Sequence, residues 1–471
     1  MTQARFDLLT MGTRLPMAVM VEELSWWSCE DETLIGMVAR DRTDDDYSWM
    51  VLARDRIGRF RAASFDVSLS SPEIAERRLV VEMAKVIDKG EIAEFGAQGD
   101  ETNSPLDPFD VPASLDRTKL HPYFVILAES PGRAPARKVI SELALWLAPK
   151  DPHFVREFQT DGFDQRLWEL FLWAAFRESM LMVEQLEAPD FRCTAPSVAF
   201  TVEATTVAPS QSGPLADHPA PRTPDELQAF LRDYMAIKFG SALTSKLGKR
   251  NAAGERYWER PESRDIPFVI AVADFHAPAT EDGPGSMVYT QEALWTYLYG
   301  VRTTHHHGAD GRLVITNESV ETHSYGTKTI PSGFFAQPDA ENVSAVIFSN
   351  AGTLSKFDRM GTAAGYGATD HKYIRFGYLV DADPNAAQGR PFSVEVDADG
   401  YAERWTQELQ VFHNPNAARP LSEDALPMAT HHRLVDGQFV SEGAADTVLA
   451  SMTLILHLRD DSADVVDPTE P

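Results

Sequence analysis

The chain has only two cysteines, Cys29 and Cys193, among 471 residues. So few thiols leave no disulfide framework and no cysteine-rich zinc module. The sequence also lacks an apolar run of the roughly 18–20 residues that a membrane span requires. Its first residues, MTQARFDLLTMGTRLP, do not show the charged-then-apolar pattern of a secretion signal. These absences predict a soluble, cytoplasmic protein with no membrane partner.

Positive charge is scarce as well. Lysine and arginine number 43 against 71 aspartates and glutamates, so the formal net charge is −28. Such a balance repels polyanions at long range and argues against broad coating of nucleic acid. A nucleic-acid enzyme with this composition needs a local basic patch or a basic partner.

The length favours two or three domains over a single core. Residues 1–95 are expected to form a small α/β domain, with strands at 33–42, 47–55 and 60–69. A helix follows, with Ser71 as its N-cap, Pro72 in its first position and Gly90 as its stop. The next stretch, 96–139, begins with many Pro, Gly, Asp and Ser residues and is interpreted as a linker or long loop.

Residues 140–310 are expected to form the core domain. A helix is predicted over 162–180, capped by Thr160 or Asp161, and two strands are predicted within 188–207. A long helical region at about 224–260 precedes the continuously apolar stretch IPFVIAVADF. Such a run is typical of a strand buried on both faces, in the middle of a sheet flanked by helices.

The last third is expected to be richer in β structure. Residues 311–458 form the predicted C-terminal domain, and 459–471 form an acidic tail predicted to be disordered. The predicted strands lie at 312–319, 343–350, 374–380, 392–396 and 453–458.

The stretch APDFRCTAPSVAFTVEATTV, residues 188–207, contains the strongest candidate site. Side chains alternate faces along a strand, so Thr201, Glu203 and Thr205 share one face. Asp190 ends the preceding strand segment, and pairing of the two strands would bring its carboxylate near Glu203. Two close carboxylates are costly unless a positive charge lies between them, and a divalent cation such as Mg²⁺ is the common answer. The simpler alternative is that Glu203 is a solvent-facing strand residue.

The flanking elements add a third carboxylate and positive charge. Glu169 lies at the margin of the apolar stripe of the helix at 162–180. Downstream, KFGSALTSKLGKRNAAGERYWE is the most basic stretch of the chain, and its Lys246 and Lys249 fall on one helical face. The basic residues of this stretch are Lys238, Lys246, Lys249, Arg250 and Arg256.

In this order of elements, and in Glu169, Pro189, Asp190 and Glu203, the region 162–275 resembles the PD-(D/E)XK superfamily of restriction-endonuclease-like nucleases. The resemblance implies an α/β (α+β multidomain) fold whose central mixed sheet is flanked by helices. It implies that Asp190, Glu203 and Glu169 bind Mg²⁺ or Mn²⁺ and that the metal activates water for phosphodiester hydrolysis. It also implies a nucleic-acid substrate, with DNA favoured over RNA, held through the basic patch.

The sequence departs from the family at Thr205, where these nucleases usually carry a lysine. Threonine is neutral and cannot supply that positive charge. Either Lys246 or Lys249 reaches back from the next helix, or the core is degenerate. In the second case the chain is a non-catalytic subunit of a larger assembly with a protein partner. The two readings differ in geometry, because catalysis requires a lysine amine within about 5 Å of the Glu203 carboxylate.

Several other residues give weaker indications of a function. The three histidines of TTHHHGADGR at 303–312 are predicted to lie in a solvated loop, and His413 has no visible partner. SNAGTLSKFDRMG lacks the spacing of a phosphate-binding P-loop, so Lys356 and Arg359 are expected in a solvated loop or on a phosphate backbone. Cys193 is expected to be a structural thiol.

Overall fold

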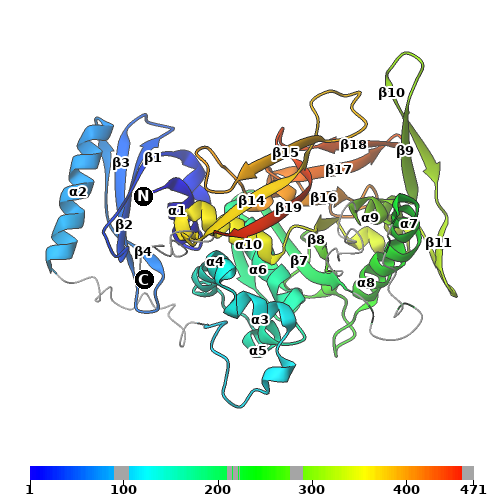
Figure 1. Cartoon of the computed structure of the whole chain (residues 1–471), viewed down its shortest axis with the longest axis horizontal. Coiled ribbons are helices and arrows are strands. Elements are labelled where there is room, and N and C mark those ends of the chain that lie inside the picture. Colours follow the sequence, from blue (N-terminus) through cyan, green and yellow to red (C-terminus); the bar gives the residue numbers. More distant parts are fainter. Residues whose placement is uncertain are drawn as a thin grey trace, which may run out of the picture.

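The computed structural model describes residues 1–89, 106–208, 210, 215, 221, 223–275 and 290–458. A small N-terminal unit lies at one end of the molecule, a large mixed sheet occupies the middle, and projecting hairpins lie at the other end (Figure 1). Within this part of the chain no helix is both long and apolar enough to cross a bilayer.

The N-terminal unit is an antiparallel meander with one helix on each face. Its four strands are β1 (Val21–Ser28), β2 (Leu34–Asp41), β3 (Tyr47–Arg54) and β4 (Phe60–Leu69). Apolar residues of α2 (Pro72–Lys89) pack on one face, and those of α1 (Gln3–Thr10) pack on the other. The first strand was not among the three predicted. The helix begins at Pro72 as predicted, and the predicted stop at Gly90 lies outside the described residues.

The central sheet has eight strands in the order β18-β17-β16-β13-β8-β7-β6-β5. It is mixed, because β7, β8 and β13 run parallel while their outer neighbours β6 and β16 pair antiparallel. The strands are β5 (Met182–Gln185), β6 (Phe191–Ala195), β7 (Val198–Val207), β8 (Phe268–Asp274), β13 (Ala345–Ser349), β16 (Gln410–His413), β17 (Thr430–Val435) and β18 (Gln438–Glu442). Every residue of β8 is buried, as its continuous apolar run predicts.

Two helices cover opposite faces of this sheet. Helix α6 (Phe163–Glu178) packs on one face, where the Trp168 indole N–H donates to the Ala271 carbonyl of β8. Helix α8 (Ala236–Gly248) packs on the other, with Phe239 against Phe348 of β13. The expected α/β architecture, a mixed sheet between helices, is therefore confirmed. The predicted caps of α6 are wrong, because Gly162 takes the N-cap position without a side-chain hydrogen bond.

The long helical region predicted at 224–260 is interrupted. It begins as α7 (Pro224–Ala229), widens into the π-helical turn η5 (Phe230–Met235) and continues as α8, which ends at Gly248. Residues 249–260 form turns and the short 3-10 helix η6 (Tyr257–Glu259). The predicted linker also contains helices: α3 (Pro122–Glu129) and the start of α4 (Ala134–Ala144) contribute to the same core as α6.

All five strands predicted in the C-terminal third are present. The expected boundary at residue 310 does not separate two sheets, because β13, β16, β17 and β18 extend the central one. A separate three-stranded sheet has the order β15-β14-β19 and lies over α10 (Leu354–Gly361) in Figure 1. Its strands are β14 (His371–Leu379), β15 (Arg390–Glu395) and β19 (Val448–His457).

Candidate active site

Asp190 and Glu203 lie side by side at the antiparallel pair of β6 and β7. Phe191 is paired with Val202, so Asp190, one residue earlier, lies beside Glu203. The Ala204 backbone N–H donates to Asp190 Oδ2 at 2.6 Å, which ties the aspartate to β7. The strand pairing expected from the sequence therefore brings the two carboxylates together.

Glu203 is not a solvent-facing residue. Its exposed fraction is 5%, and its neighbours on the same face, Thr201 and Thr205, are buried as well. This face is covered by α8 and η6, because Lys246 Nζ donates to Glu203 Oε1 at 2.5 Å and the Tyr257 hydroxyl donates to the same oxygen at 2.7 Å. The other oxygen, Oε2, is buried and has no hydrogen-bond partner among the residues that the structure describes.

Lys246 meets the 5 Å distance criterion, and Lys249 does not contribute. Lys246 lies in the last turn of α8 and reaches Glu203, whereas Lys249 follows the helix end and is exposed. No side-chain hydrogen bond or ion pair of Lys249 is present within the described residues. A lysine from the next helix thus supplies the charge that Thr205 lacks.

The positive charges of the basic stretch do not gather on one surface, although they are close together in the sequence. Arg256 pairs with Asp339, Lys238 donates to the Ser210 hydroxyl, and Arg250 donates to the carbonyl of Gly254. Of its five cations, only Lys246 lines the cleft described below.

Burial and neighbouring negative charge make the Asp190 carboxylate basic. Desolvation is the main cause that raises the pKa of Asp190 well above its ordinary value, and the charges of Glu203 and Glu169 add to it. The Ala204 N–H and the Lys246 ammonium oppose this shift in pKa only partly. Burial and the two neighbouring carboxylates therefore oppose ionisation of Asp190 more than the Ala204 N–H and Lys246 favour it.

Glu169 approaches from α6 and is held by residues of its own helix. Gln165 donates to its Oε1 at 2.9 Å, and Arg166 donates to its Oε2 at 2.8 Å. Desolvation raises the pKa of Glu169, Arg166 lowers it, and Glu203 raises it again. Each oxygen of Glu169 thus accepts one hydrogen bond from its own helix and keeps a further lone pair, so its role as a metal ligand stays a prediction. Arg166 also pairs with Asp151 and Glu157.

A cleft of about 390 Å³ is lined by Glu169 and Asp190, whereas Glu203 lies beside Asp190 but is not among the lining residues. Glu169, Asp190 and Lys246 line it together with two further cations, Lys150 and Arg166. Amide groups of Gln165 and Gln185 add polar donors to the wall. The cleft thus combines unsatisfied carboxylate charge with side chains that suit phosphate oxygens.

The fit of a metal ion rests on two carboxylates. Among the residues that the structure describes, no group of three or more His, Cys, Asp or Glu side chains is placed to hold a metal ion. Asp190 and Glu203 nevertheless suit a hard cation, because Mg²⁺ commonly takes one or two carboxylates and fills its remaining positions with water and phosphate oxygens. The buried, unpartnered Oε2 of Glu203 is the acceptor that such an ion would satisfy.

A scan against models of protein families, a search of curated proteins and a search of solved structures each find no match to this chain. The resemblance to restriction-endonuclease-like nucleases therefore rests on the residues of this site and the order of its elements alone.

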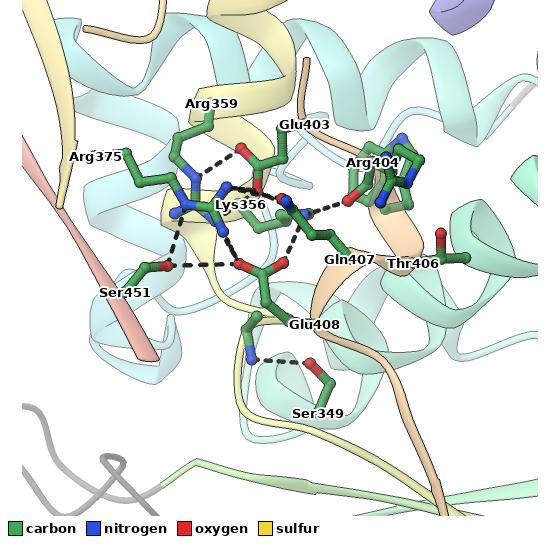
Figure 2. Close-up of polar contacts among 12 residues, drawn as sticks. Ser349, Lys356, Arg359, Arg375, Glu403, Arg404, Thr406, Gln407, Glu408 and Ser451 are labelled. Carbon is green, nitrogen blue, oxygen red and sulfur yellow. Dashed lines mark hydrogen bonds and ion pairs between the residues drawn. The ribbon is translucent and has the colours of Figure 1, made fainter. Parts of the chain in front are cut away.

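Lys356 and Arg359 are not in a solvated loop, and their burial leaves them no surface for a phosphate backbone. They lie in α10 with exposed fractions of 0% and 3% and belong to a buried ion cluster with three other residues. We call it the C-terminal ion cluster; it comprises Lys356, Arg359, Arg375, Glu403 and Glu408 (Figure 2). The sequence did not reveal it because its members come from segments far apart in the chain.

Three further expectations concern the remaining histidines and Cys193. The histidines 305–307 are exposed but lie in strand β9 (Val301–His307), so the predicted loop is wrong. His413 does have a partner, because its Nε2 lies 2.9 Å from Nδ1 of His431. Cys193 is fully buried, and burial raises the pKa of its thiol well above the ordinary value, as suits a structural thiol.

Proposed function

We propose that this protein is a metal-dependent nuclease that hydrolyses phosphodiester bonds at the cleft beside Asp190 and Glu203. The observation that carries the proposal is the contact between Lys246 and Glu203, 2.5 Å long, beside a buried carboxylate oxygen without a partner. A lysine, a glutamate and an aspartate meet where the order helix, strand, strand, helix and buried strand of this nuclease superfamily would lead us to expect the site.

Asp190 and Glu203 would hold Mg²⁺ or Mn²⁺. When bound, such an ion lowers the pKa of a water molecule and stabilises negative charge on a phosphoryl group. Lys246 lies beside the same carboxylates and lines the cleft, so its ammonium can stabilise the charge that develops on phosphate oxygens. Arg166 also lines the cleft, but its guanidinium is already bound to Asp151, Glu157 and Glu169, so Lys246 is the main candidate for a phosphate contact.

Nucleic acid is the substrate class that this chemistry suits, with DNA favoured over RNA. The cleft lies in a strongly acidic protein, so attraction of the polyanion has to be local. Lys150, Arg166 and Lys246 line the cleft together with the acidic Asp151, Glu169, Glu187 and Asp190, so a bound divalent cation would have to supply the additional positive charge. We therefore expect binding to weaken steeply as the salt concentration rises.

The experiment that tests the proposal compares DNA cleavage by the wild-type chain and two lysine variants, with Mg²⁺ or Mn²⁺ present. Lys246→Met should reduce the cleavage rate by about 10²–10³-fold, the usual effect of losing one charge-stabilising donor. Lys249→Met is the matched control and should cleave like the wild type. Absence of metal-dependent cleavage by the wild-type protein, or equal rates for all three, would overturn the proposal.

The second candidate function is a non-catalytic subunit of a larger assembly. One observation favours it: the outer face of the β15-β14-β19 sheet exposes large apolar side chains, a feature of protein interfaces. The residues are Phe376, Tyr378, Met452, Leu454 and Leu456. Wild-type protein that neither binds Mn²⁺ nor cleaves DNA would favour this candidate.

A further inference from the structure

Tyr257 makes the other close contact to Glu203. It lies in η6, is 2% exposed, and donates its hydroxyl to Oε1 of Glu203 at 2.7 Å. Lys246 donates to the same oxygen. Both donors therefore hold the carboxylate by one oxygen and leave Oε2 without a partner.

The ring of Tyr257 is fixed between two other side chains. Phe268 stacks against it with ring centroids 5.5 Å apart and planes 14° from parallel. The Arg260 guanidinium lies 4.6 Å from the ring centroid on a cation–π contact. A side chain held in this way has little freedom, so the direction of its hydroxyl is set by packing.

Arg260 connects this arrangement to the other carboxylate. It is buried and donates to the carbonyl oxygen of Ala188 at 2.9 Å, two residues before Asp190. One guanidinium thus braces both the Tyr257 ring and the turn that carries Asp190. The supports of the two carboxylates form one connected unit.

An acceptor that is buried without a partner is destabilising, and such groups in folded proteins need an explanation. Rotation of the Glu203 carboxylate could expose Oε2 to a donor, but the two bonds to Oε1 oppose that rotation. We propose that Tyr257, braced by Arg260, is a positioning residue that directs Oε2 of Glu203 at the divalent cation. This inference rests on the proposed function.

The test is a calorimetric titration of Mn²⁺ into the full-length chain, together with the electron paramagnetic resonance spectrum of the bound ion. Tyr257→Phe removes only the hydroxyl, and we expect about tenfold weaker binding, as for other residues that orient metal ligands, with an altered spectrum. Tyr299→Phe is the matched control, because Tyr299 donates its hydroxyl to the backbone carbonyls of His413 and His432 instead. It should leave the affinity and the spectrum unchanged.

Glu203→Ala separates failure of this inference from failure of the proposed function. If Glu203→Ala abolishes binding while Tyr257→Phe leaves both affinity and spectrum unchanged, Tyr257 has no positioning role and only the inference fails. If the wild type does not bind Mn²⁺, or Glu203→Ala binds it equally well, the proposed function fails first. Should Tyr257→Phe not fold, Arg260→Lys provides the second test. It should weaken Mn²⁺ binding by a smaller factor, and unchanged binding by that variant would overturn the inference.

Discussion

Two buried groups of charged side chains in the described part of the chain differ in how completely their carboxylate oxygens are paired. In the C-terminal ion cluster every oxygen of Glu403 and Glu408 accepts at least one hydrogen bond, and three cations face two carboxylates (Figure 2). At the candidate active site one cation, Lys246, faces the carboxylates of Asp190 and Glu203, and one buried oxygen has no partner.

The pKa values of the carboxylates also differ between the two groups: they are lowered in the C-terminal ion cluster and raised for Asp190 at the candidate active site. Burial alone would raise the pKa of Glu403 and Glu408, but the surrounding Arg359, Lys356 and Arg375 charges outweigh it and lower both values. Burial and like charge instead raise the pKa of Asp190. A cluster whose charges are all paired stabilises the fold, whereas a site with an unpartnered buried carboxylate oxygen is one that a bound cation would stabilise.

The largest expected effect follows from breaking the C-terminal ion cluster. Glu403→Gln leaves Lys356 and Arg359 buried with one carboxylate fewer, and we expect the free energy of unfolding to fall by about 3–5 kcal/mol. Denaturant unfolding measures this loss. Glu395→Gln is the control, because the Lys372–Glu395 pair is exposed and should be worth at most about 1 kcal/mol. Equal small losses for both variants would show that the cluster is not structural.

The next effect is stabilisation by metal at the candidate active site. With Mn²⁺ at a hundred times its dissociation constant, mass action predicts a gain of about 2.7 kcal/mol in the free energy of unfolding. Asp190→Asn should abolish the gain, and EDTA should reverse it in the wild type. A gain that survives Asp190→Asn would place the ion elsewhere.

Without metal, the same substitution should act in the opposite direction to Glu403→Gln. Asp190→Asn removes a buried carboxyl group whose ionisation burial, Glu203 and Glu169 oppose, and an asparagine carbonyl can still accept from the Ala204 N–H. We expect unfolding stability at pH 7 to stay the same or rise by up to about 1 kcal/mol, a common trade of function against stability. A loss of several kcal/mol would mean that the charge of Asp190 is structural.

The smallest effects are opposite slopes of stability against pH. An aspartate whose folded pKa is raised keeps its proton longer in the folded state, so stability is lost as pH rises from about 3.8 through the folded pKa. The stability advantage of Asp190→Asn over the wild type should therefore grow with pH.

Glu403 has a lowered folded pKa, so its stabilisation is present above about 4.5 and is lost as pH falls below it. The deficit of Glu403→Gln should shrink in acid, and unfolding curves between pH 3 and 7 would reveal parallel slopes if this assignment is wrong.

Local patterns predicted the elements around the site well. The alternation in β7, the apolar run of β8 and the amphipathic stripe of α6 identify their elements because each depends on near neighbours in sequence. Strand pairing then placed Asp190 beside Glu203, and helical spacing placed Lys246 within reach. Spacing could not choose between Lys246 and Lys249, because the choice depends on where α8 ends.

Long-range packing accounts for most of what the sequence did not reveal. Lys356 and Arg359 are charged residues in a Gly- and Ser-containing stretch, and only the arrival of Glu403 and Glu408 makes their burial tolerable. The extension of the central sheet by β13 and β16 likewise depends on partners distant in sequence. Tyr257 was missed at the site for a related reason: its only signal is an aromatic residue within the basic stretch, and its role depends on η6, which brings its hydroxyl to Glu203.

The measurement that tests the central claim most directly is calorimetry of Mn²⁺ binding to the wild-type chain, Asp190→Ala and Glu203→Ala. The proposed site predicts binding of one ion by the wild type and loss of binding in both variants. Binding that is absent from the wild type, or that persists in the variants, would contradict it and leave Glu203 as an ordinary buried strand residue.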